Sequence, residues 1–71
     1  MYPIEKYGWI KENKVTSNLL FFKEGIFRQR SVIFVYHISS HKVFIDSVVE
    51  ISLEELQAIY ETAEQIRKEN E

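Results

Sequence analysis

Apolar residues near the end of the chain recur at steps of three and four, which is the period of one face of an α-helix. This stripe comprises Leu53, Leu56, Ile59, Tyr60, Ala63 and Ile66. Ser52 and Glu55 form a capping-box signature at its start, and Arg67 and Lys68 complement the helix dipole at its end. The pattern predicts an α-helix over about residues 53–69 whose apolar stripe packs in the core.

Upstream, the segment 32–51 is rich in Val, Ile, Phe and Tyr, and it predicts two strands around a turn at "ISSHKV". Pairing Ile38 with Val43 would place Tyr36 opposite Ile45 and Phe34 opposite Ser47. Because side chains alternate between the faces of a strand, one face is expected to lie under the helix. It carries Val32, Phe34, Tyr36, Ile38, Val43, Ile45, Val49 and Ile51. The opposite face is half apolar and carries Ile33, Val35, His37, Phe44, Asp46 and Val48.

A second hairpin is predicted around "KEG", because Gly25 can take the positive φ of a tight turn. A two-residue loop would set Phe22 opposite Phe27, and a three-residue loop would set it opposite Ile26. We expect a bulge near "RQRS", which would keep Arg28 and Arg30 off the helix-covered face. In the first fifteen residues, "KYGWIK" favours an edge strand over a helical turn opened by Pro3.

These elements predict an α+β domain in the order β-β-β-β-α, with a small antiparallel sheet of three to four strands and one C-terminal helix on one face. The whole chain, 1–71, is expected to form a single domain, with strands and hairpins over about 6–51 and the helix over 53–69. One helix cannot cover both faces of a sheet. The second face is therefore expected to be covered by another copy of the chain, by a partner protein, or by residues 1–12.

Composition supports self-association. A chain of 71 residues buries a small core, and it has no cysteine with which to form a disulfide. Residues 1–46 contain seven basic and four acidic residues, whereas residues 47–71 contain two basic and seven acidic ones. The opening segment lacks the apolar region of a secretory signal, and no apolar stretch approaches the roughly 20 residues that span a bilayer. We therefore expect a small soluble cytoplasmic protein that does not enter a membrane.

The semi-apolar sheet face is the leading candidate site. An apolar centre with a polar rim is typical of a protein interface, and aromatic side chains dominate binding energy there. The predicted interface comprises Ile33, Val35, His37, Phe44, Asp46, Val48 and Phe27. This composition favours a homodimer that also binds an unidentified protein partner. A small acidic chain of this kind is typical of a regulator or inhibitor that occupies another protein.

The alternative is a single-stranded nucleic-acid-binding protein. Such proteins combine basic side chains with aromatic rings on which bases stack. The candidate residues are Lys23, Arg28, Arg30, Lys42 and Phe22. Four strands followed by Ile51-Ser52-Leu53 at the helix start resemble the transcriptional coactivator PC4 family. That resemblance implies a dimer that binds single-stranded DNA through strand surfaces, although Val49-Glu50 stands where the family usually has lysine-glycine.

Catalytic and metal-binding patterns are weak. Ser40 and His41 are adjacent in the turn, and the predicted register sets His37 diagonal to Asp46 on a flat sheet rather than in a cleft. The four-residue spacing of the two histidines does not aim both rings at one ion outside a helix. The two glycines are isolated, so no phosphate-binding loop is predicted. We expect no enzyme activity, no cofactor and no metal.

Overall fold

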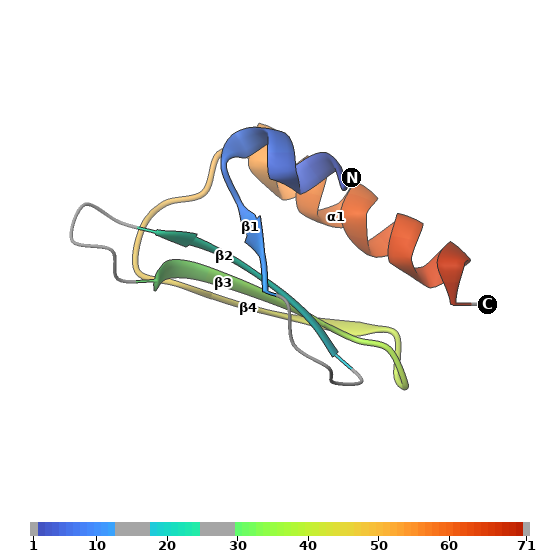
Figure 1. The fold of residues 1–71 in the computed structure, drawn as a ribbon. Coiled ribbons are helices and arrows are strands. Elements are labelled where there is room, and N and C mark those ends of the chain that lie inside the picture. Colours follow the sequence, from blue (N-terminus) through green and yellow to red (C-terminus); the bar gives the residue numbers. More distant parts are fainter. Residues whose placement is uncertain (1, 13–17, 25–29, 71) are drawn as a thin grey trace.

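A computed structural model describes residues 2–12, 18–24 and 30–70 of the chain. A four-stranded antiparallel sheet is formed in the order β1-β2-β3-β4, and one long helix crosses one face of it (Figure 1). The strands are β1 (Ile10–Lys11), β2 (Asn18–Glu24), β3 (Arg30–His37) and β4 (Lys42–Ser47). This arrangement confirms the predicted α+β fold.

The helix α1 (Leu53–Glu69) has the predicted bounds. Its N-terminus is capped by Ser52, whose hydroxyl accepts the Glu55 backbone N–H at 3.0 Å. The Glu55 carboxylate also accepts the Ser52 hydroxyl, and its other oxygen accepts the Trp9 indole N–H at 2.9 Å and Lys23 Nζ at 3.1 Å. Glu55 therefore joins the start of the helix to two distant segments.

The hairpin of β3 and β4 is shifted from the predicted register. Tyr36 lies opposite Val43, and Phe34 lies opposite Ile45. The turn spans four residues between His37 and Lys42, and His41 takes a positive φ of 54° there. The predicted pairing was wrong by two residues, but a two-residue slip leaves every side chain on its predicted face.

The pairing of β2 with β3 also differs from the prediction. Phe22 lies opposite Ile33, not opposite Phe27 or Ile26, because the hairpin closes at Glu24 and Arg30. The predicted turn at "KEG" was wrong for Lys23 and Glu24, which belong to β2, and Gly25 lies outside the described residues. The expected bulge is confirmed: Ser31 is the extra residue between the pairs Lys23–Val32 and Glu24–Arg30. Its hydroxyl donates to the Lys23 carbonyl at 3.0 Å.

The N-terminal segment forms a short 3-10 helix, η1 (Pro3–Tyr7), before β1. The predicted edge strand over 6–11 was wrong for most of its length, since only two of its residues pair with β2. Pro3 opens the turn with a φ suited to a helix start, and Gly8 ends it at φ 90°, where a side chain would be strained. η1 lies beside α1, on the side of the sheet that the helix occupies (Figure 1).

A buried Thr62 holds η1 against α1. Its hydroxyl accepts the Ile4 backbone N–H at 3.1 Å and donates to the Ala58 carbonyl at 2.7 Å. Nearby, the Tyr2 hydroxyl donates to Glu69 at 2.8 Å, and burial together with this carboxylate raises the pKa of Tyr2 to about 12. The core between helix and sheet contains Ile4, Trp9, Phe21, Val32, Phe34, Tyr36, Ala58, Ile59 and Ile66.

Candidate functional site

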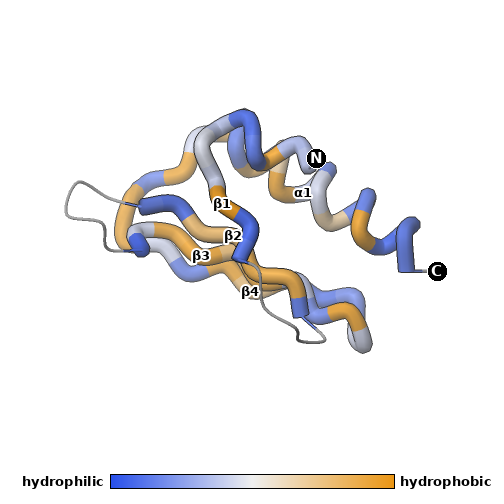
Figure 2. Tube along the Cα trace, in the orientation of Figure 1, coloured by the Kyte–Doolittle hydropathy of each residue, from blue (hydrophilic) through white to orange (hydrophobic). Residues whose placement is uncertain are grey.

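β4 carries exposed apolar side chains on both faces of the sheet. Its side chains Val43, Phe44 and Ile45 are 45%, 54% and 37% exposed, whereas Val32, Phe34 and Tyr36 on the neighbouring β3 are almost fully buried. The buried core joins α1 and η1 to β2 and β3 and includes no residue of β4. Hydrophobic residues nevertheless continue along β4 (Figure 2). This strand thus carries core-type residues on a surface.

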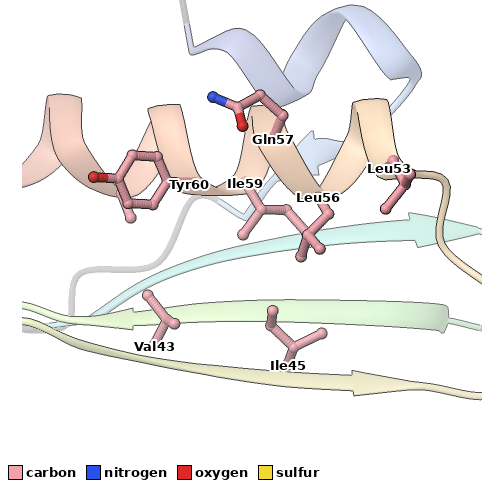
Figure 3. Close-up of a pocket in the computed structure, with 8 residues that line it drawn as sticks. Val43, Ile45, Leu53, Leu56, Gln57, Ile59 and Tyr60 are labelled. Atoms are coloured by element: carbon pink, nitrogen blue, oxygen red, sulfur yellow. The ribbon is translucent and has the colours of Figure 1, made fainter.

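An apolar groove of about 540 Å³ separates β4 from α1. Val43 and Ile45 point up from the strand, and Leu56 and Ile59 point down from the helix (Figure 3). Leu53 and Tyr60 lie along the helix side of this β4–α1 groove. The prediction that the whole helix stripe is core was wrong for Leu53, Leu56 and Tyr60, which are 80%, 49% and 61% exposed.

The helix is turned toward η1, which explains the exposed half of its stripe. Its buried residues are Ala58, Ile59, Thr62 and Ile66, a set displaced toward the side that η1 occupies. Because Ile4 is anchored on Thr62, η1 packs alongside α1 on the same face of the sheet. The sheet edge at β4 is left without this cover. Sequence reasoning missed the groove because it treated the N-terminal segment as a strand.

The predicted interface residues on β3 and β4 share the sheet face opposite α1, which we call the far face. Ile33, Val35 and His37 on β3 lie opposite Asp46, Phe44 and Lys42 on β4. Ile33, Val35 and His37 are half-buried, and Phe44 and Asp46 are exposed. Val48 follows β4 and is 79% exposed. Phe27 lies outside the described residues.

The far face extends across β1 and β2. Ile10 is paired with Phe22, and Leu20 is paired with Val35, so these apolar side chains continue the patch. The predicted alternative, a cover formed by residues 1–12, is not seen in residues 2–12. η1 lies on the α1 side of the sheet (Figure 1). β1 pairs with β2 at the edge of the sheet and so extends it.

The nucleic-acid candidates are divided between the two faces. Lys23 points toward the helix and pairs with Glu55 at 3.1 Å. Arg30 lies on the far face, where it pairs with Glu12 at 2.8 Å and covers the Phe22 ring at 4.4 Å from its centroid. Lys42 stands at the other end of the sheet, and Arg28 lies outside the described residues. The described members therefore do not form one basic surface.

The histidines and their neighbours are not arranged as predicted. His37 lies opposite Lys42, and Asp46 lies opposite Ile33, so the diagonal contact between His37 and Asp46 was wrong. The reason is the two-residue shift in register. His41 instead shares a 2.6 Å hydrogen bond between its Nδ1 and the Tyr36 hydroxyl. Over 2–12, 18–24 and 30–70, no three His, Cys, Asp or Glu residues gather closely enough to hold a metal ion.

Within the part of the chain that the structure describes, no helix has both the length and the apolar character needed to cross a membrane. Comparison with known proteins finds no matching protein-family model, no matching curated protein and no matching solved structure.

Proposed function

We propose that this protein is a non-enzymatic interaction module that forms a homodimer and acts as a regulator or inhibitor by occupying a partner protein. The observation that carries the proposal is the exposure of β4 on both faces of the sheet. Val43 and Ile45 line the groove on one side, and Phe44 lies in the apolar far face on the other. Large exposed apolar patches on small domains usually mark association sites.

The two surfaces suit two different partners. The β4–α1 groove runs beside the strand at the edge of the sheet, so a second copy seated there could extend the sheet and the core together. The far face is broad and lies away from the groove, so it stays accessible in such a dimer. We assign the groove to the second copy and the far face to the partner protein. Burial of the groove would also stabilise a domain of only 71 residues.

A charge in the groove is expected to dissociate the homodimer. Leu56→Glu places a carboxylate among apolar side chains, and Leu56 is 49% exposed, so the fold should tolerate the change. The mass measured by analytical ultracentrifugation should be twice 8.5 kDa for the parent protein and 8.5 kDa for the variant. Gln65→Glu adds the same charge on α1 outside the groove and should leave the dimer intact. A parent protein that stays monomeric at every concentration would contradict the homodimer.

A charge on the far face is expected to abolish partner binding without dissociating the dimer. Val35→Glu changes the centre of the face, and Val35→Thr offers a polar variant of nearly the same shape should the first fail to fold. Both are compared with the parent by affinity capture from the native host and by sedimentation. A protein that the parent retains and both variants lose would support the far face. Equal capture by the parent and both variants would contradict the assignment of the partner protein to the far face.

A further inference from the structure

The hydrogen bonding of β4 determines which backbone groups remain at the outer edge of the sheet. In an antiparallel ladder, every second pair exchanges hydrogen bonds. The Val48 N–H donates to the Ser31 carbonyl at 3.0 Å, and the register continues this series through Asp46, Phe44 and Lys42. Val43 and Ile45 therefore turn their N–H and C=O groups outward. β4 is the last strand of the sheet formed by the described residues, so it presents these groups to a further strand.

We propose that β4 pairs antiparallel with β4 of a second copy, about a two-fold axis at Phe44. This inference rests on the proposed homodimer and specifies how it is built. The axis must pass through a residue, because an axis between residues would join an outward-facing residue to an inward-facing one. It would also place the two α1 helices on opposite faces of the joint sheet.

Charge complementarity selects Phe44 among the residues that could carry the axis. An axis at Phe44 sets Lys42 of each copy opposite Asp46 of the other, and it sets the two Phe44 rings side by side. An axis at Ile45 would set Phe44 opposite Asp46, and an axis at Val43 would set Lys42 opposite Phe44. Opposite charges and aromatic pairs stabilise cross-strand neighbours, whereas a ring facing a carboxylate does not. An axis at Val43 would also set Asp46 opposite Ser40, so the carboxylate would lose its cationic partner.

The same axis brings the β4–α1 grooves of the two copies together. Val43 and Ile45 are the outward-facing pair, so each Val43 would lie opposite Ile45 of the other copy on the helix side. Leu56 and Tyr60 line the helix side of the groove (Figure 3), and they would do so in both copies. One register therefore pairs the outward backbone groups of the two β4 strands, sets Lys42 opposite Asp46, and brings the two apolar grooves together. β4 also lacks proline and a central charge, which are devices that block edge pairing.

A single introduced cysteine tests the axis, because the chain has none of its own. Phe44 would form a pair without mutual hydrogen bonds, in which Cα atoms lie about 4.5 Å apart and a disulfide can form. Phe44→Cys should convert to a covalent dimer under mild oxidation. Val48→Cys is the matched control. Val48 is on the same face and is 79% exposed, but the Val48 positions of the two copies would lie far apart. Equal cross-linking of both variants would overturn the axis.

Charge reversal provides an independent test of the register. Lys42→Asp alone creates two like-charge pairs by symmetry and should weaken dimerisation about tenfold. Combining it with Asp46→Lys should restore the dimer, because the two exchanged side chains would again face each other with opposite charges. A dimeric parent whose affinity neither change alters would overturn this register and leave the homodimer standing. A parent that is monomeric throughout would instead overturn the proposed function.

Discussion

Phe34→Ala is expected to lower the free energy of unfolding by about 3–5 kcal/mol, which would leave a domain of this size largely unfolded. Phe34 is fully buried in the central strand β3, directly beneath α1. Its ring meets Phe21 edge-on, with centroids 5.5 Å apart. Truncation would remove this aromatic contact and leave a cavity where helix and sheet meet. Urea unfolding followed by the emission of the buried Trp9 measures the loss.

Phe44→Ala is the matched control for Phe34→Ala. It removes the same side chain from the neighbouring strand, but Phe44 is 54% exposed and lies on the opposite face. At a concentration where both variants are monomeric, it should lower stability by under about 1 kcal/mol. Similar losses for the two variants would contradict the placement of the core between α1 and β3.

Glu55→Ala is expected to lower the free energy of unfolding by about 2 kcal/mol, because hydrogen bonds to a charged group are among the stronger ones. One carboxylate oxygen accepts both the Trp9 indole N–H and Lys23 Nζ. Removing it leaves a buried indole donor without its partner. Glu54→Ala, one residue earlier in the same helical turn, changes an exposed carboxylate and should lower stability by under about 0.5 kcal/mol. Urea unfolding of the two variants measures the difference.

The Glu55 contacts also predict a dependence on pH. The hydrogen bond from Trp9, helped by Lys23, lowers the pKa of Glu55 from its ordinary value of 4.5. A depressed pKa in the folded state means that the unfolded chain takes up the proton first as pH falls. The stabilisation is thus complete above about pH 4.5 and is lost as pH falls through the folded pKa. The stability difference between the parent and Glu55→Gln should shrink in that range, and a constant difference would contradict this assignment.

The helix and the faces of the main hairpin were predictable because their signals are local. Ser52 and the three-and-four spacing define α1, and strict alternation assigns Phe34 and Val35 to opposite faces whatever the register. The register itself was not predictable, since a slip of two residues keeps the same hydrophobic pattern. Its error carried into the site, where it set His37 beside Asp46.

The groove was not predictable because it depends on a contact between distant segments. Ala58 and Thr62 lie outside the predicted apolar stripe, yet both are buried. Only the position of η1 explains their burial. Pro3 and Gly8 do indicate a helical turn, but the aromatic and branched residues between and after them favour a strand. The conformation of this N-terminal segment determines which half of the helix stripe is exposed.

The link between Ile4 and Thr62 has a consequence for how the protein is made. The two residues are 58 positions apart, and α1 is the last element of the fold along the chain. During synthesis, the early segment that supplies Ile4 and Trp9 must wait for the helix before it can dock. Until α1 docks, the strands lack its cover, so the newly made chain exposes Phe21 and Phe34 to other chains. Any delay in the docking of α1 should therefore prolong this exposed state and favour aggregation.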